Sequence, residues 1–112
     1  MQIHTMNLRK KYFYFIKNGT KRIELRLFDE KRKNIKLGDT IEFVLSENEK
    51  LKAEVIGLSK YRSFKDLVEY FDVSILADLS MTKKELLDEI NQFYPPEKQS
   101  KFNVLGICIK LL

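Results

Sequence analysis

The sequence contains few of the residues that build cross-links and metal sites. It has one cysteine and one histidine among its 112 residues. A disulfide framework, a cysteine-based zinc site and a histidine-rich metal site are therefore excluded. The cysteine, Cys108, lies in the apolar run 104–109, where the role to expect is that of a small buried thiol. We expect no metal site and no cofactor.

Long hydrophobic runs are missing as well. No apolar stretch approaches the roughly 20 residues of a membrane span, and residues 1–6 lack the charged start and long apolar stretch of a signal peptide. The chain has no repeat and no low-complexity segment. We expect a cytoplasmic protein without a membrane partner. We also expect one domain over residues 1–112, since a chain of this length can bury a single modest core but hardly two.

Basic residues outnumber acidic ones. Lysine and arginine total 21 against 16 aspartate and glutamate, which gives a formal net charge of +5. This excess favours an anionic partner such as RNA or a nucleotide, although solubility alone explains it equally well.

Apolar periodicity predicts a strand, a helix and a second strand in the first 27 residues. Residues 3–6 fit a short strand. Residues 8–16 carry apolar side chains at helical spacing behind Asn7, the expected N-cap, and Asn18-Gly19 ends that helix. Residues 21–27 alternate between apolar and polar, which is typical of a half-buried strand.

The remaining sequence predicts three strands and two helices. Gly38-Asp39 is a turn signal before strands at 40–44 and 51–58, which a polar hairpin connects. Helices are expected behind capping boxes at Ser63 and Thr82, and the second should stop at 94–96, where two prolines follow a tyrosine. The almost entirely apolar stretch 102–111 predicts a last strand that is central or closes a barrel.

This order of elements predicts the α+β class, with a small, mostly antiparallel β-barrel of about five or six strands flanked by two or three helices. The connections between the middle strands are too short for helical crossovers, which favours antiparallel pairing. Closure into a barrel also protects strand edges. An open α+β sandwich is the alternative.

The densest polar cluster spans residues 19–32. Within it, Glu24 and Arg26 emerge on the same face of the expected strand, about 7 Å apart along it. They can form an ordinary surface ion pair. They can also converge on one ligand, because arginine presents a donor fork to phosphate or a carbonyl group while glutamate accepts from an amino group.

Two ordered segments resemble the ASCH family, named for homology to a transcription coactivator. The first is G-x-K-x-x-E-x-R at 19–26, and the second is I-x-x-G-D-x-I-x-F at 35–43. The ending, Y-P-P-E at 94–97 followed by V-L-G-I at 104–107, resembles the close of the family too. The resemblance implies a PUA-like β-barrel with a cleft beside it, and RNA or a modified nucleoside as the ligand.

The resemblance also extends to small bacterial ASCH proteins that remove the acetyl group from N4-acetylcytidine. They use a lysine, a hydroxyl residue three positions later and a distant acid. Lys21 matches the lysine, whereas Glu24 stands where the hydroxyl residue would be, and Asp78 or Glu85 are candidates for the acid. Hydrolysis by this chain would need Glu24 as general base for water, with Lys21 or Arg26 stabilising the oxyanion.

Three functions are compatible with these patterns. The first is an RNA- or nucleoside-binding module whose ligand-binding residues are Lys21, Glu24, Arg26, Arg32 and Tyr94. The second is an amidohydrolase acting on N4-acetylcytidine-like nucleosides, or a ribonuclease, with Lys21 and Glu24 as catalytic residues. The third is a protein-interaction scaffold.

Further residues have a functional and a plain structural interpretation. His4, the single histidine, is expected to pack or hydrogen-bond at a strand end. Aromatic side chains at element ends can stack on a base or simply pack, and nearby basic residues can contact phosphates or only confer solubility. The aromatic residues are Tyr61, Tyr94 and Phe102, and the basic ones are Lys60, Arg62, Lys98 and Lys101.

Overall fold

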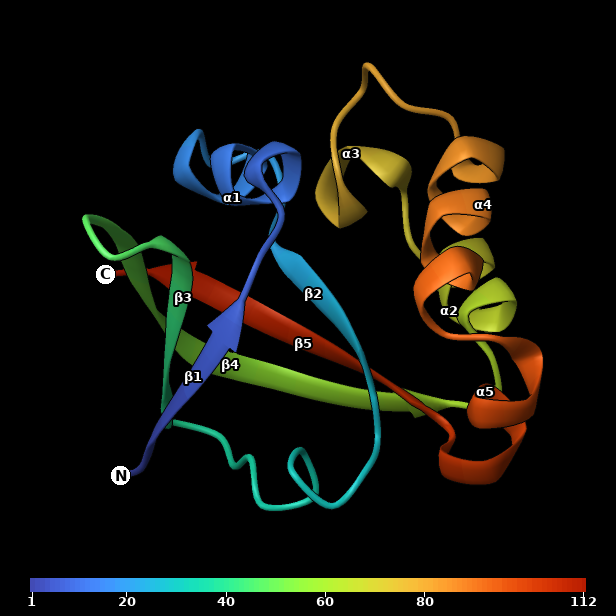
Figure 1. The fold of residues 1–112 in the computed structure, drawn as a ribbon, viewed down its shortest axis with the longest axis horizontal. Coiled ribbons are helices and arrows are strands. Elements are labelled where there is room, and N and C mark those ends of the chain that lie inside the picture. Colours follow the sequence, from blue (N-terminus) through green and yellow to red (C-terminus); the bar gives the residue numbers. More distant parts are fainter.

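The computed structural model describes residues 1–112 and contains five strands and five helices (Figure 1). In chain order they are β1 (Ile3–Asn7), α1 (Lys10–Lys17), β2 (Ile23–Leu27), β3 (Thr40–Ser46), β4 (Glu49–Tyr61), α2 (Phe64–Tyr70), α3 (Val73–Leu76), α4 (Lys83–Phe93), α5 (Pro96–Phe102) and β5 (Val104–Leu111).

The strands form one curled sheet in the order β1-β3-β4-β5-β2 (Figure 1). All neighbours pair antiparallel except β1 and β3, which are parallel. The 13-residue β4 pairs with β3 through its first half and with β5 along most of its length, and a β-bulge between Val55 and Gly57 helps it to bend. The predicted α+β class and the mostly antiparallel, PUA-like barrel are confirmed.

Apolar side chains form two buried clusters, one on each face of this curl. The inner cluster lies between the sheet and α1, with Phe13 and Ile16 of the helix packed against Ile41 and Phe43 of β3. The outer cluster joins β2 to the helices that follow β4, and it includes Phe64, Leu67, Val68, Leu76 and Leu86. As a result, β2 is covered on both faces.

The strand β2 departs from its prediction for this reason. Alternation predicted a half-buried strand, but all five of its residues are buried. Ile23, Leu25 and Leu27 belong to the outer cluster, while Glu24 and Arg26 are enclosed on the other face. The interpretation of Glu24 and Arg26 as a solvated surface pair is thus wrong.

Helix boundaries were predicted well where caps are local. Ser63 accepts a hydrogen bond from the main chain of Asp66, Thr82 forms a full capping box with Glu85, and Tyr94 ends α4 before the prolines. Asn7, however, is the last residue of β1, because its strand continues in register opposite Val44. Arg9 occupies the N-cap position of α1 and makes no side-chain cap.

Two further short helices, α3 and α5, raise the number above the two or three predicted. The first follows an Asp72 cap, and the second begins at Pro96, whose fixed backbone suits the first turn of a helix. The four residues of α3 are too few to show apolar periodicity, and α5 is almost entirely polar. Cys108 is half-buried rather than fully enclosed, and burial raises the pKa of its thiol.

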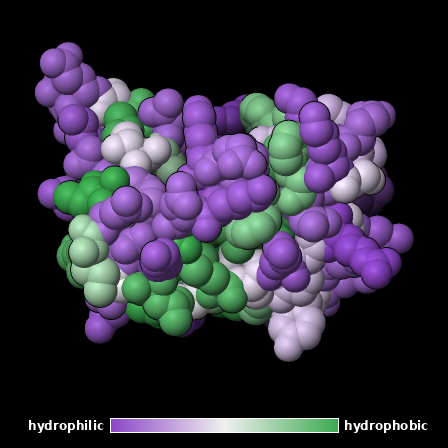
Figure 2. All heavy atoms as spheres, turned by 90° about the horizontal axis from the view of Figure 1, so that it is seen from below, coloured by the Kyte–Doolittle hydropathy of each residue, from purple (hydrophilic) through white to green (hydrophobic).

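Seen from below, the surface is mainly hydrophilic, and hydrophobic residues gather in a smaller patch to one side (Figure 2). None of the helices combines the length and the apolar character that crossing a membrane requires.

Candidate functional site

A cavity of about 340 Å³ opens at the seam between the two edge strands, β1 and β2. Its walls come from the end of β1, from β2, and from the helices α1 and α4. The lining residues are Asn7, Leu8, Arg9, Tyr12, Lys21, Glu24, Leu25, Arg26, Leu86, Ile90, Phe93 and Tyr94.

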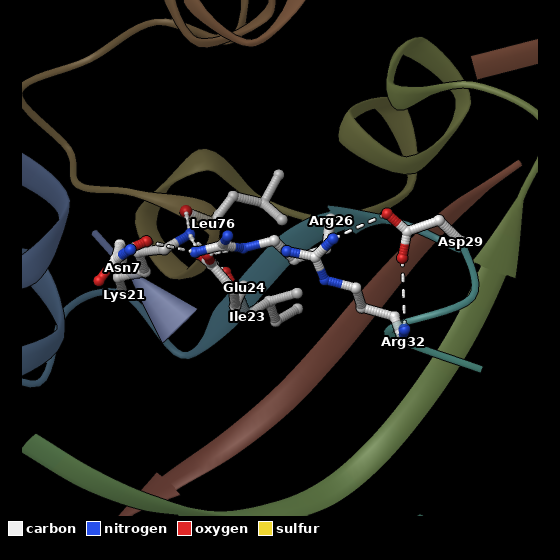
Figure 3. A network of polar contacts seen from close by, with 8 residues as sticks. All are labelled: Asn7, Lys21, Ile23, Glu24, Arg26, Asp29, Arg32 and Leu76. Atoms are coloured by element: carbon white, nitrogen blue, oxygen red, sulfur yellow. Dashed lines mark hydrogen bonds and ion pairs between the residues drawn. The ribbon is translucent and has the colours of Figure 1, made fainter. Parts of the chain in front are cut away.

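Three charged side chains are buried along one wall of this cavity (Figure 3). Lys21 Nζ lies 3.3 Å from Glu24 Oε1, and Arg26 Nε donates to Glu24 Oε2 at 2.7 Å. The side chains of Lys21, Glu24 and Arg26 are only 2%, 6% and 11% exposed. We call them the buried triad; it carries one negative and two positive charges.

The Lys21 ammonium group is fully occupied within the chain. It donates to the main-chain oxygens of Ile23 at 2.6 Å and Leu76 at 2.8 Å, in addition to its contact with Glu24. An ammonium group has three protons to donate, so these three partners use them all. In this arrangement Lys21 fixes the start of β2 to α3.

Arg26 keeps part of its donor capacity free. Its Nε binds Glu24, and one terminal nitrogen, Nη2, donates to the main-chain oxygen of Asn7 at 2.7 Å. The other terminal nitrogen, Nη1, takes part in neither of these bonds, and the Tyr94 hydroxyl interacts with the guanidinium. Since Arg26 and Tyr94 both line the cavity, a ligand there can contact this part of the guanidinium.

Burial and charge compete over the pKa values of the triad. Burial lowers the pKa of Lys21 below its usual range, and Glu24 opposes this effect. For Glu24, burial raises the pKa, but Arg26 and then Lys21 outweigh it and leave the pKa lowered. Burial lowers the pKa of Arg26, but Glu24 and then Tyr94 reverse the shift. Glu24 and Arg26 are therefore ionised at neutral pH.

Apolar and aromatic side chains make up the rest of the cavity wall. Phe93 is 51% exposed at the rim, where the Arg9 guanidinium lies 4.9 Å from its ring centroid. Tyr12 lies deeper and donates to Glu89 at 3.1 Å. Burial, followed by Glu89, raises the pKa of Tyr12 well above its usual range, so its hydroxyl remains protonated. This combination suits a flat ring that carries polar acceptors.

Comparisons with known proteins assign the chain to one family. The model of the ASCH domain matches residues 6–112. The chain belongs to the ASCH domain family. No curated protein matches the sequence.

Solved structures of ASCH proteins and their relatives have the same fold. The crystal structure of hypothetical protein PH0355 is 37% identical over the whole of both chains, with a TM-score of 0.88. The solution structure of protein PF0455 from Pyrococcus furiosus is 34% identical, covers 99% of this chain and 98% of that one, and has a TM-score of 0.79. The ASCH protein of Zymomonas mobilis, at 13% identity, covers 97% of this chain and 67% of that one with a TM-score of 0.61, and it supports the fold alone.

Four of the predicted site residues of this ASCH domain, Lys21, Glu24, Arg26 and Tyr94, line the same cavity. Arg32 lies outside the lining, where its guanidinium donates to Asp29 at 2.8 Å (Figure 3). The aspartate three residues earlier in the turn is its local partner, so Arg32 is not directed to the cavity.

Neither candidate for a distant acid lines the cavity. Asp78 accepts a hydrogen bond from the main chain of Ser80, and Glu85 is occupied by the capping box of Thr82. Ser80, through its side chain and then its main chain, lowers the pKa of Asp78, and the main chain of Thr82 lowers the pKa of Glu85. No group of three or more side chains of the metal-ligating types is present.

Sequence analysis missed several lining residues, chiefly Arg9, Tyr12 and Phe93. Tyr12 and Phe93 belong to the apolar stripes of α1 and α4, where core packing was the simpler interpretation. The only available signal was the hydroxyl of Tyr12, a polar group within an apolar stripe. Only the packing of α4 against α1 brings Phe93 next to Arg9.

Proposed function

We propose that this ASCH domain binds RNA through a single nucleobase or modified nucleoside held in the cavity at the β1–β2 seam. The observation that supports this most directly is the buried triad, whose two cations and one carboxylate line a cavity that is otherwise mainly apolar. Two positive charges and one negative charge leave a net charge of +1, which favours an electron-rich or anionic ligand.

The chemistry of the walls fits a base better than a free anion. Phe93 and Tyr94 offer aromatic faces on which a base can stack, and such stacking is worth about 1–3 kcal/mol per base. The Arg26 guanidinium can donate to a carbonyl oxygen of the base. A cavity of about 340 Å³ is at the small end of ligand sites, which suits one nucleoside rather than several.

The hydrogen bonding of the triad supports binding over hydrolysis. A general base must readily take up a proton, but each oxygen of Glu24 faces a cation, and Arg26 and then Lys21 lower the pKa of Glu24. All three protons of Lys21 have partners. We therefore expect N4-acetylcytidine to bind without release of cytidine, and chromatography of an overnight incubation would detect any turnover.

Calorimetric titration with uridine, cytidine, N4-acetylcytidine and their monophosphates tests the proposal. We expect at least one of these ligands to bind. Phe93→Ser should weaken binding by roughly tenfold, because it removes a stacking face. Phe93 is half-exposed, so this variant should remain folded.

Exposed Leu79 offers a control, since it lies outside the cavity. Leu79→Ser should leave nucleoside affinity unchanged. If no nucleoside or nucleotide binds at low salt, or if both variants weaken binding equally, the assignment of this cavity is wrong.

A further inference from the structure

We propose that a second site, formed by Lys60, Arg62 and Asn103, binds the phosphate groups of a single-stranded RNA whose base occupies the first cavity. The inference rests on the proposed function in that both sites serve one RNA. It extends that function from one nucleoside to a strand.

The second site is a cavity of about 400 Å³ where β4 leads into α2 and α5 leads into β5. It is lined by Lys60, Tyr61, Arg62, Asp66 and Asn103, and it shares none of these residues with the first cavity. Its two basic side chains and one acidic side chain leave a net charge of +1. A single apolar lining residue makes it unlike a hydrophobic docking groove.

The two cations of this site have no acidic partner. Neither Lys60 nor Arg62 forms an ion pair within the chain, whereas Arg9, Arg26 and Arg32 all do. The Lys60 ammonium lies 4.6 Å from the centroid of the Phe28 ring, which holds the side chain in place without neutralising it. Phosphate oxygens are the ligands that such unpaired cations favour.

Asn103 adopts a backbone conformation that is almost confined to glycine, with φ 64° and ψ 179°. Its main chain donates to Gln99 and accepts from Phe28, and a glycine could make both bonds without strain. The Asn103 side chain makes no hydrogen bond within the chain, so nothing internal offsets its strain. The amide that lines the cavity is thus free to donate to a ligand.

An aromatic platform adjoins the basic residues. Tyr61 lies 6.0 Å from Tyr70 and 6.3 Å from Phe71 between ring centroids, and Tyr70 is 74% exposed. Basic residues beside exposed aromatic rings are what sequence-tolerant single-strand binding requires. A base that follows the bound phosphate can stack on Tyr70.

Strand register connects the two sites. Leu105 of β5 is opposite Arg26 of β2 on one side and opposite Lys60 of β4 on the other. Directly opposite residues point to the same face of a sheet, so Arg26 and Lys60 lie in one row. Two strand spacings separate them by roughly 10 Å, a distance that a short oligonucleotide can span.

Fluorescence anisotropy with an oligouridylate of about ten nucleotides, compared with uridine monophosphate, tests the inference. Lys60→Ser and Arg62→Ser should each weaken oligonucleotide binding several-fold. Each should also reduce the slope of log affinity against log salt by about 0.7. Neither should change monophosphate affinity. Lys50→Ser is the matched control, because Lys50 is exposed and unpaired at the opposite end of β4.

Asp66 and Asn103 give two opposite readouts. Asp66→Asn removes the only negative charge of the site and should tighten oligonucleotide binding. Asn103→Gly should raise the melting temperature by relieving strain, yet weaken oligonucleotide binding. A merely structural role for Asp66 would not tighten binding in Asp66→Asn. A merely structural role for Asn103 would not combine a higher melting temperature with weaker binding in Asn103→Gly.

The outcomes separate this inference from the proposed function. Unchanged oligonucleotide affinity in the Arg62 and Lys60 variants, with monophosphate binding intact, overturns the second site alone. If the native protein binds the oligonucleotide through Arg62 but does not bind the monophosphate, the first cavity is wrong and the second site stands. Binding of an acidic protein but no RNA overturns both.

Discussion

The guanidinium of Arg26 and the main-chain oxygen of Asn7, 2.7 Å apart, join the two edges of the sheet. No main-chain hydrogen bond links β1 to β2, so this side chain spans the seam that barrel closure would otherwise leave open. The same guanidinium neutralises Glu24. One residue thus closes the fold and shapes the cavity.

Substitutions in the buried triad should destabilise the protein to different extents. Glu24→Gln leaves two adjacent buried cations without a counter-charge, and we expect it to lower the free energy of unfolding by about 3–5 kcal/mol. Arg26→Met leaves the neutral pair of Lys21 and Glu24 and should cost less. Urea denaturation of the two variants measures the order, and a Glu24→Gln variant as stable as the native protein would contradict it.

The triad shows what sequence could and could not predict. A period of two placed Glu24 and Arg26 on one face, and the motif at 19–26 marked them as a candidate site. Burial of that face was not predictable, because it depends on a distant partner: Asn7 lies 19 residues from Arg26. Likewise Leu76, whose main-chain oxygen accepts a hydrogen bond from Lys21, lies 55 residues away.

The distinction between local and distant partners also explains the other predictions. Caps and stops such as those at Thr82 and Pro95 depend on a few neighbouring residues, so they were predicted correctly. The parallel pairing of β1 with β3 depends on how the chain returns after residues 28–38, a segment without periodicity. Arg32 was expected at the cavity as a basic residue of the cluster at 19–32, but its ion pair with Asp29 holds it in the turn.

Acid should lower the free energy of unfolding, partly through Asp39. The hydrogen bond from His4, followed by that from the main chain of Lys36, lowers the pKa of Asp39 from 3.8 to about 2. The unfolded chain therefore takes up a proton first, and the stabilisation present above pH 3.8 is lost as the pH falls toward about 2.

Asp39→Asn gives the corresponding measurement. We expect its urea midpoint to lie below that of the native protein near neutral pH, and the gap to close as the pH falls through this window. A gap that stays constant across the window would show that the Asp39 charge contributes nothing.

Substitutions at Gly19 should measure how much a left-handed backbone conformation costs in stability. It ends α1 with φ at 83°, and a Cβ added there would meet no atom within 4 Å. Gly19→Ala should therefore destabilise by about 1–2 kcal/mol through conformation alone. Gly19→Asn should cost less, since asparagine tolerates this region better. Thermal unfolding compares the two, and equal losses would point to a contact rather than to the backbone.

Glu89 should weaken the binding of anionic ligands in the cavity. It accepts from Lys11 at 2.6 Å and from Tyr12 at 3.1 Å, and it lies 3.9 Å from Arg9. Glu89→Gln removes a carboxylate that competes with an anionic ligand for Arg9. Because these pairs are partly exposed, we expect a stability loss of no more than about 1 kcal/mol.

The informative readout for Glu89→Gln is the ratio of two affinities. A nucleoside monophosphate should bind the variant more tightly than the native protein, because Arg9 is freed to pair with its phosphate, while the neutral nucleoside should bind both equally. Spectrophotometric titration should also show a lower pKa for Tyr12, since Glu89 helps burial to raise it. Parallel calorimetric titrations decide the matter: equal changes for the charged and neutral ligands would mean that Glu89 acts only by holding α1 against α4, and not through its charge.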